Sequence, residues 1–585
     1  MANVFFSFEP FESSAFQNGY DSLQGDMREG LNKRKQAYSS AVEGCGVTDH
    51  ITYKHGFNQH KAPEETIQIS RYHEEMFSDF EMLDETVYSQ SSQESPKLES
   101  ILHEISDIAE HKKEQQISLA SLKLLSNYRS ELRRSNEDKL NKQRPTSTTA
   151  DGRRLSTEEV LRVAGARYIQ LFVEKDDDLS MLGHPFGCAL FGLSDEEIKD
   201  VELVHFLLGA VEKVGNKQFE RASKLLSQCY YLASNTGNPV QRVVYYFAEA
   251  LQERIDRETG RTPFGKRTQD VDVEEAMMSL NPAIMGYYQR LPFSQMLQVA
   301  GTQAIMENIG LAKRVHLIDL SIRTGMQWIV LMHALAARSE CPVELFKVTA
   351  IGTTSQQTIE ETGRRLSGFA ETINLPFSFK VVMVSHMKDI KEDLFELQAE
   401  EAVAVFSPMV LRTMIAQPDH LEDLMKAIKH INPCIMVISE MEADHNSPIF
   451  VSRFVETLFF YGAFFDSFDA CTDRDDQNRM MAEKIFSSQA IRNIVATEGQ
   501  ERTIRHVGIN VWRAFFSQFE MVETELSESS LYQARLVLEK FACASSCSLD
   551  MKGKCLTMGW KGTPFHSLSA WKFHQSDVSM CETAT

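Results

Sequence analysis

The chain has 585 residues, of which 43% are hydrophobic and 24% are charged, a composition that can bury a sizeable core in two or three regions. Its 82 acidic and 61 basic side chains give a formal net charge of −21, which argues against a protein that grips DNA mainly by neutralising phosphates. No run approaches the roughly 18–20 apolar residues of a membrane-spanning helix, so we expect no membrane segment. The ten cysteines lie far apart, which favours reduced thiols in a soluble intracellular protein.

Residues 1–150 differ from the rest of the chain in composition and in hydrophobic periodicity. They mix Phe and Tyr with Asp, Glu, Ser and Gln, as in FFSFEPFESSAFQNGYDSLQGDM, without helical or strand periodicity. Such segments bury too little apolar surface to offset chain entropy, so we expect a disordered arm with one helical stretch near 98–134. Acidic-aromatic mixtures can be transcriptional activation segments, and a solvated tail without a partner is the equal alternative.

Residues 155–310 are predicted to form a helical region. Apolar residues recur at helical spacing in successive segments, which are joined by short turns such as NTGNP at 235–239. Short connections between amphipathic helices favour an antiparallel bundle. The apolar stripe of these helices is a candidate interaction surface, although packing of the core is the first interpretation because amphipathic helices usually bury their stripe. Its members are Leu203, Leu207, Val211, Leu225, Leu226 and Val244.

Residues 311–585 alternate short β-rich runs with helical patterns. Continuous apolar strands of this kind are typical of a parallel sheet that is covered on both faces. We therefore predict an α/β fold with a doubly wound, Rossmann-like sheet, in which the closing strands pair antiparallel. The expected strands are 314–320, 345–351, 378–384, 402–407, 434–440, 519–526, 555–560 and 569–573.

The turn after the first of these strands lacks the residues that bind a cofactor. It reads IDLSIRTGMQW, in which Asp319 ends the strand and Gly325 is the only glycine. A cofactor cradle needs several glycines, so that the backbone can approach the ligand closely. The second strand also ends without an acidic residue to hold a ribose hydroxyl. We therefore expect no bound cofactor.

Other catalytic or metal-binding patterns are also weak. The segment 260–267, GRTPFGKR, nearly matches a phosphate-binding loop, but Arg267 stands where a hydroxyl should bind magnesium. Cysteines 543, 547 and 555 with His566 match no compact zinc-ligand spacing. The sequence therefore predicts no catalytic residues and no metal site.

Three short strings stand out downstream of the leucine-rich block at 201–255. The first is VHLID, made of Val315, His316, Leu317, Ile318 and Asp319. The second is spread over Pro376, Phe460, Tyr461, Arg505 and His506. The third lies near the end of the chain and consists of Ser569, Ala570 and Trp571.

This series resembles the plant GRAS family of transcriptional regulators over about residues 155–575, with the strings as its VHIID, PFYRE and SAW regions. Leu317 replaces the first isoleucine of VHIID. The resemblance implies a helical cap with the first leucine-rich region at 155–310, over a Rossmann-like core at 311–585. It also implies a nuclear protein that contacts transcription factors and other GRAS proteins, as a homo- or heterodimer, and reaches DNA indirectly.

Three functions remain open at this point. The first is a GRAS-type regulator of plant development, hormone signalling or root symbiosis that acts by protein contacts. The second is an S-adenosylmethionine-dependent methyltransferase, and the third is a factor that binds specific DNA directly. The chain has no Asp-Glu-Leu-Leu-Ala string, so gibberellin-receptor control of the DELLA type is not expected. DELLA-like subgroups without that arm and symbiosis-related branches both stay open.

Overall fold

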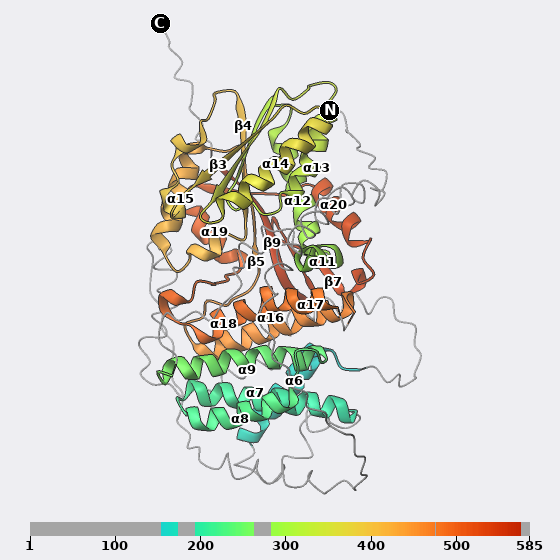
Figure 1. The fold of residues 1–585 in the computed structure, drawn as a ribbon, viewed down its shortest axis with the longest axis vertical. Coiled ribbons are helices and arrows are strands. Elements are labelled where there is room, and N and C mark those ends of the chain that lie inside the picture. Colours follow the sequence, from blue (N-terminus) through green and yellow to red (C-terminus); the bar gives the residue numbers. More distant parts are fainter. Residues whose placement is uncertain (1–153, 174–192, 262–281, 474–475, 575–585) are drawn as a thin grey trace, which may run out of the picture. The chain divides into compact units, whose positions relative to one another are not determined.

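The computed structural model describes residues 154–173, 193–261, 282–473 and 476–574. The expected disordered arm at 1–150, with its helical stretch near 98–134, lies outside these residues. In the described ranges, no helix is both long enough and apolar enough to cross a membrane. The described elements form a helical layer beside a region in which helices cover a sheet (Figure 1).

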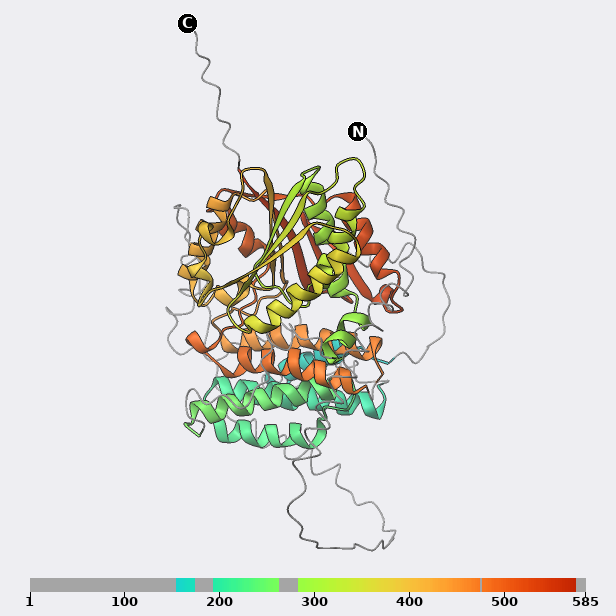
Figure 2. The ribbon, with the colours of Figure 1, turned by 45° about the horizontal axis from the view of Figure 1, so that its top comes forward.

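Four helices from the first half of the chain form the outer part of the helical layer (Figures 1 and 2). Two of them begin with reciprocal caps, which satisfy backbone amides that a helix start leaves free. Ser194 Oγ accepts from the amide of Glu197 at 3.3 Å, and Asn238 Oδ1 accepts from the amide of Gln241 at 3.0 Å. The helices are α6 (Thr157–Val173), α7 (Asp195–Gly215), α8 (Phe219–Leu232) and α9 (Pro239–Glu258).

Helices from residues 450–496 lie between α9 and the sheet (Figures 1 and 2). They are α16 (Phe450–Cys471), α17 (Gln477–Ala482) and α18 (Gln489–Ala496), with a π-helical segment, Glu483–Ser488, before α18. Arg242 of α9 is fully buried and joins the two sets of helices. Its guanidinium donates to Asp469 at 3.0 Å and to the carbonyl of Phe465 at 3.2 Å, and it lies 3.2 Å from the carboxylate of Glu483.

A second buried arginine, Arg453, fixes the amino-terminal end of α16. Its guanidinium donates to the carbonyls of Ile494 at 3.1 Å and Ser447 at 2.7 Å, and it pairs with Glu498. Removing one partner from such a buried set leaves an uncompensated charge, which is costly. The helices of 450–496 therefore belong to one interior with α9, although about two hundred residues separate them in sequence.

The sheet has nine strands in the order β3-β2-β1-β4-β5-β9-β8-β7, with β6 beside β9. The first five strands are parallel and the remainder pair antiparallel. The strands are β1 (Arg314–Asp319), β2 (Leu345–Gly352), β3 (Phe377–Met383), β4 (Glu401–Pro408), β5 (Ile435–Met441), β6 (Met521–Thr524), β7 (Cys547–Lys552), β8 (Cys555–Trp560) and β9 (Thr563–Phe573). This order of the parallel strands is that of a Rossmann-like sheet.

Helices cover both faces of the sheet (Figure 1). On one face lie α12 (Phe293–Ile309), α13 (Met326–Ala336) and α14 (Gln356–Thr372), and α20 (Glu528–Leu538) packs on α12. Helix α11 (Pro282–Arg290) instead packs against α17 of the helical layer. On the other face, α15 (Pro418–Ile431) and α19 (Ile509–Ser517) share a buried core with Ile318, Val405 and Ile438. The predicted α/β fold class, with a mostly parallel Rossmann-like core and additional helices, is confirmed.

The strand boundaries agree with the sequence except near the end of the chain. The structure adds β7, which the sequence did not predict, and begins β9 at Thr563 instead of residue 569. The strand expected at 519–526 is limited to β6. Strand β7 reads CSLDMK and is half-exposed, so it has no continuous apolar run to mark it.

Helix α14 packs closely on β3 because it carries a glycine at the contact. A Cβ at Gly363 would lie 2.3 Å from Cδ1 of Phe379, whereas a Cβ at Gly368 of the same helix would meet no atom within 4 Å. The two glycines therefore differ in the space around them and share the same helical backbone.

We predict that Gly363→Ala lowers the free energy of unfolding by about 1–3 kcal/mol because the methyl group overpacks the contact with Phe379. The matched variant Gly368→Ala should leave stability unchanged or raise it by up to about 1 kcal/mol, since alanine favours a helix over glycine. Urea unfolding followed by circular dichroism measures both. Equal effects of the two substitutions would contradict this packing.

Candidate functional site

The carboxyl end of β1 is the place where a Rossmann-like sheet usually binds its ligand. Here Asp319 is fully buried, and other residues of the protein hydrogen-bond its carboxylate. Its carboxylate accepts from the indole nitrogen of Trp328 at 2.9 Å and from the amide of Ser321 at 3.1 Å. Burial raises the pKa of Asp319 to about 7. The Trp328 ring lies edge-on to Phe406, with centroids 5.0 Å apart, so this strand end is closed by side chains.

Side chains fill the space beside two glycines, Gly325 after β1 and Gly352 at the end of β2, so no room is left there for a ligand. Gly325 has a left-handed φ of 70°, and a Cβ there would lie 2.9 Å from Thr362. A Cβ at Gly352 would lie 2.3 Å from Ile359 and 3.0 Å from the sulfur of Met383. The space beside both glycines is therefore occupied by α14 and β3, and neither turn forms a phosphate cradle.

The VHIID-like string is part of the interior of the sheet. All of its members are buried: Val315, His316, Leu317, Ile318 and Asp319. His316 Nε2 lies 2.8 Å from the hydroxyl of Thr349, and Nδ1 lies 3.2 Å from the carboxylate of Glu401. Burial, with Lys347 and Lys380 nearby, lowers the pKa of His316 to about 3, so the imidazole is neutral and the contact with Glu401 is not an ion pair.

Four members of the PFYRE-like set come together beside the loop that follows β5. Phe460 and Tyr461 of α16 pack on the ring of His445, with centroids 5.1 and 6.2 Å away. Nδ1 of His445 lies 2.8 Å from Nδ1 of His506. Arg505 extends along the same loop. Since both histidines are buried, this cluster fixes the loop and presents no side chain for catalysis.

The remaining contacts show that Arg505 has a structural partner and that Pro376 lies apart. Arg505 donates to Asn446 Oδ1 at 3.2 Å and to the carbonyl of Gly499 at 2.8 Å. Pro376 is exposed just before β3, and its carbonyl accepts from the amide of Phe346 at 2.8 Å. The structure therefore does not bring Pro376 to the other members of the set.

Two carboxylates at the end of β5 were missed by the sequence reasoning. Glu440 accepts from the amides of Leu411 at 2.9 Å and Arg412 at 3.3 Å, and burial raises its pKa to about 7. Glu442 accepts from the amide of Ile509 at 2.9 Å, where α19 begins. The string ISEMEADH, in which acidic residues follow an apolar strand, was the available signal. Both side chains hold neighbouring turns in place.

The SAW-like residues lie on β9, in the middle of the sheet. Ser569, Ala570 and Trp571 pair with Ile438, Val437 and Met436 of β5. The indole of Trp571 donates to Ser569 Oγ at 2.9 Å, and its ring centroid lies 4.7 Å from that of Phe516. These three residues therefore join the antiparallel part of the sheet to the parallel part.

The stripe that was considered as an interaction surface is inside the helical layer. Its members are at most 3% exposed: Leu203, Leu207, Val211, Leu225, Leu226 and Val244. Of the two interpretations, packing of the core agrees with this burial. A partner that contacted the stripe would first have to displace one of the helices.

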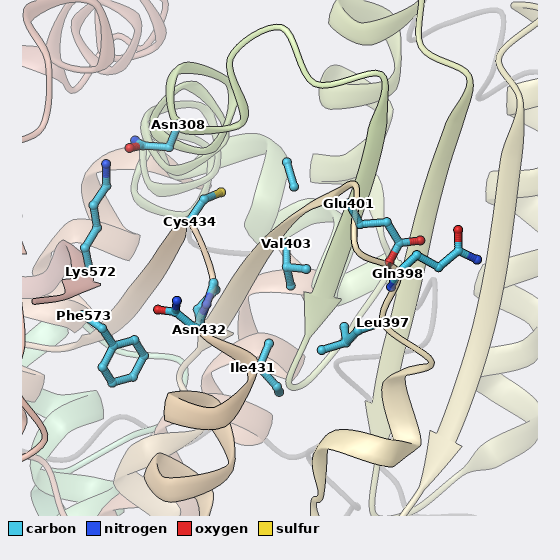
Figure 3. A pocket seen from close by; sticks show the side chains of 12 residues that line it. Asn308, Leu397, Gln398, Glu401, Val403, Ile431, Asn432, Cys434, Lys572 and Phe573 are labelled. Atoms are coloured by element: carbon cyan, nitrogen blue, oxygen red, sulfur yellow. Dashed lines mark hydrogen bonds between the residues drawn. The ribbon is translucent and has the colours of Figure 1, made fainter. Parts of the chain in front are cut away.

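A hollow of about 490 Å³ lies at the amino edge of the sheet, where β4 and β5 begin (Figure 3). Lys572 and Glu401 lie on opposite sides of it, and the Glu401 side chain is 1% exposed and turned to His316. Burial raises the pKa of the Cys434 thiol. The hollow therefore contains no pair of groups arranged for nucleophilic or acid–base chemistry. Its polar lining includes Asn308, Gln398, Glu401, Asn432, Cys434 and Lys572.

Metal binding has no support in the described ranges. No three side chains of His, Cys, Asp or Glu there are arranged to hold a metal ion. The candidate zinc ligand His566 is buried on β9, and neither of its ring nitrogens has a hydrogen-bond partner among the described residues. Burial, with Arg412 and Arg323 nearby, lowers the pKa of His566 to about 3.

We predict that His566 makes the fold acid-sensitive. Because its folded pKa lies below the unfolded value of about 6.5, its stabilising contribution is present above pH 6.5 and is lost as the pH falls toward 3. His566→Phe should therefore reduce the loss of unfolding free energy between pH 6 and pH 4 by about 2–3 kcal/mol. Urea unfolding at several pH values measures this difference.

The neighbouring substitution Phe565→Leu is the matched control. It also changes a buried side chain of β9, but it removes no titratable group, so its cost should be the same at every pH. Parallel pH profiles of wild type and His566→Phe would contradict a buried neutral imidazole.

Comparison with known proteins identifies a protein family over most of the chain. Residues 203–572 match the GRAS domain family. The chain is 33% identical over 385 residues to the DELLA protein GAI1 of Vitis vinifera, and the aligned region covers 65% of this chain and 63% of that protein. It is 32% identical over 383 residues to the DELLA protein RGL1 of Arabidopsis thaliana, which covers 65% and 72%. The chain thus spans slightly less than two thirds of the first relative.

A solved structure agrees with the fold. The crystal structure of SCL7 in Oryza sativa superposes with a TM-score of 0.57 at 24% identity, over 63% of this chain and 99% of that one. The family match covers more than half of the sequence and includes all three strings described above. The chain therefore belongs to the GRAS domain family.

Proposed function

We propose that the protein is a nuclear co-regulator of transcription that acts by contacting transcription factors and other GRAS proteins, and that it is not an enzyme. The observation that carries this proposal is the filled carboxyl edge of the sheet. Asp319 is held by Trp328 and Ser321, and side chains occupy the space beside Gly325 and Gly352. A methyltransferase would need this volume for its cofactor.

The relatives support a role in plant hormone signalling, development or root symbiosis. Two of them are DELLA proteins by name, but this chain contains no Asp-Glu-Leu-Leu-Ala string. We therefore propose a regulator of this kind without gibberellin-receptor control. In this proposal the folded region, alone or as a homo- or heterodimer with another GRAS chain, is the platform that reaches DNA through its partners.

The arm at 1–150 is proposed as the segment that recruits the transcription machinery. Its acidic-aromatic composition supports this role. The net charge of −21 disfavours the alternative in which the chain grips DNA itself by phosphate contacts. Because the arm and the folded region have different roles in this proposal, deletion of the arm tests it.

We predict that the full chain, tethered to a neutral DNA-binding domain, changes transcription of a reporter gene, and that residues 150–585 tethered in the same way lose activation. The reporter needs a moderate basal level, so that repression is also visible. A platform that depends on its partners should recover GRAS proteins or transcription factors from plant nuclear extract. No change in transcription from either chain, together with no such partner, would sink the proposal.

We also predict that calorimetric titration of the full chain with S-adenosylmethionine gives no binding at micromolar concentrations, since side chains occupy the edge where the cofactor would lie. A known methyltransferase titrated under the same conditions is the positive control. Micromolar binding would revive the enzymatic alternative and would mean that α14 moves away from the turn.

A further inference from the structure

Three arginine side chains, which we call the arginine cluster, converge on the loop that follows β5. Arg453 lies on α16, and Arg502 and Arg505 lie in the segment before α19. Their guanidinium groups donate to three consecutive residues of the loop: Arg502 to the carbonyl of His445 at 3.1 Å, Arg505 to Asn446 Oδ1 at 3.2 Å, and Arg453 to the carbonyl of Ser447 at 2.7 Å. Since consecutive Cα atoms are about 3.8 Å apart, these hydrogen bonds hold the three cations close to one another.

Carboxylates in the described ranges balance only part of this charge. Glu498 pairs with Arg453, and it also lies 2.8 Å from the guanidinium of Arg254 of α9. Arg502 and Arg505 donate instead to backbone carbonyls and to a neutral side-chain amide, and neither forms an ion pair within the described ranges. Even before Arg254 is counted, the cluster has three positive charges and one carboxylate, so two positive charges are left unmatched.

Arg502 is the member of the cluster that most lacks a partner. It is only 4% exposed, and its Nε has no hydrogen-bond partner among the described residues. Burial, with Arg453 and Arg505 nearby, lowers the pKa of its guanidinium, which means that the surroundings disfavour its positive charge. A buried cation without a counter-ion is costly, so an anion bound beside Arg502 would be stabilised.

The cluster reaches the surface at the exposed turn Gly499–Glu501. The hydrogen bond from Arg505 to the carbonyl of Gly499, at 2.8 Å, lies at the surface. A Cβ at Gly499 would meet no atom within 4 Å, so the space beside the turn is open. The side chain of Glu498, just before the turn, is 46% exposed. An anion in solution can therefore approach the arginine cluster from this side.

Charge and geometry select a phosphate monoester over other anions. A phosphate monoester carries about −1.5 to −2 at pH 7, which matches the two positive charges that Arg502 and Arg505 leave unbalanced. A carboxylate, or a phosphodiester of the DNA backbone, carries a single negative charge. Planar guanidinium groups also bind phosphate oxygens through paired hydrogen bonds.

Other arginines near the cluster already have carboxylate partners. Arg257 of α9 lies 2.8 Å from Glu253 and 2.8 Å from Glu501. Arg492 of α18 lies 2.6 Å from Glu253. The arginine cluster is therefore distinguished from its surroundings by unmatched charge, and the paired arginines supply a control.

We propose that the arginine cluster is a binding site for a phosphate monoester, which is either a phosphorylated side chain or a free phosphate compound. The phosphate oxygens accept from the guanidinium groups of Arg502 and Arg505. Arg453, which is held by the carbonyls of Ile494 and Ser447, adds positive charge. Where the phosphate belongs to a partner protein, this inference rests on the proposed function by protein contacts.

Phosphate binding at this place would have a local structural effect. Arg505 donates both to the loop after β5, at Asn446, and to the turn that begins at Gly499. A phosphate that fixes the Arg505 guanidinium therefore fixes the loop and the turn together. The outer surface at the end of α18 would be more rigid with phosphate bound than without it.

The test uses the full-length protein with inorganic phosphate as the probe. We expect calorimetry at pH 7 to show saturable binding, and the melting temperature to rise with phosphate but not with chloride at the same ionic strength. Arg502→Gln or Arg505→Gln should weaken phosphate binding by about ten-fold or more, because charge-assisted hydrogen bonds are lost. Arg505→Lys, which keeps the charge, should lose less affinity than Arg505→Gln.

Arg492→Gln is the matched control, since it removes an arginine that is paired with Glu253 and should leave phosphate binding unchanged. Circular dichroism shows whether each variant is folded. Arg502 is buried, so the half-buried Arg505 provides the decisive variant if Arg502→Gln does not fold. Because these measurements need no partner protein, their failure is distinguishable from failure of the proposed role in transcription.

A phosphoserine flanked by alanines, compared with the same peptide without phosphate, separates the two sources. Tighter binding of the phosphopeptide than of inorganic phosphate identifies a phosphorylated side chain, and equal or weaker binding identifies a free phosphate compound. The proposal is wrong if phosphate gives no saturable effect, or if Arg502→Gln and Arg505→Gln bind it as wild type does. Arg505-dependent binding of duplex DNA that is tighter than that of both phosphate probes would also overturn it.

Discussion

The hydrogen bonds that Asp319 accepts from Trp328 and Ser321 close the end of β1. The indole of Trp328 also packs edge-on against Phe406, so side chains of the protein fill the position at which related sheets hold a ligand. The buried carboxyls of Asp319 and Glu440 both have pKa values raised to about 7. Both carboxylates accept hydrogen bonds from backbone amides of neighbouring turns. This end of the sheet therefore holds the surrounding backbone in place.

Buried arginines extend this interior into the helical layer. Arg242 and Arg453 bind backbone carbonyls and carboxylates of helices that are distant in sequence. Because a buried charge without its partner is costly, the helices cannot separate without a large penalty. The VHIID-like string, the SAW-like strand and the stripe of α7–α9 all lie in this interior. The partner contacts that we propose would therefore be made by the outer faces, whose shape these buried residues maintain.

The sequence allowed the fold to be predicted where the pattern is local. Continuous apolar runs marked β1 to β5, and the series of strings identified the family. The pattern carried no signal for β7, because its residues are half-exposed, nor for the contact of α9 with helices of 450–496, because tertiary packing alone brings them together. Pro376 and Arg505 share a motif in sequence but not a site in space.

The central place of β9 in the sheet has a consequence for synthesis of the protein. Strand β5 ends at Met441 and its neighbour β9 begins at Thr563, so a ribosome adding about 5–20 residues per second needs roughly 6–24 s to supply the missing strand. Until then the edge of β5 is an unpaired template for aggregation, and we expect nascent chains to depend on chaperones during this interval. A premature stop codon before residue 563 would leave an open seam in the middle of the sheet, so early truncations should be cleared by proteolysis instead of persisting as shorter regulators.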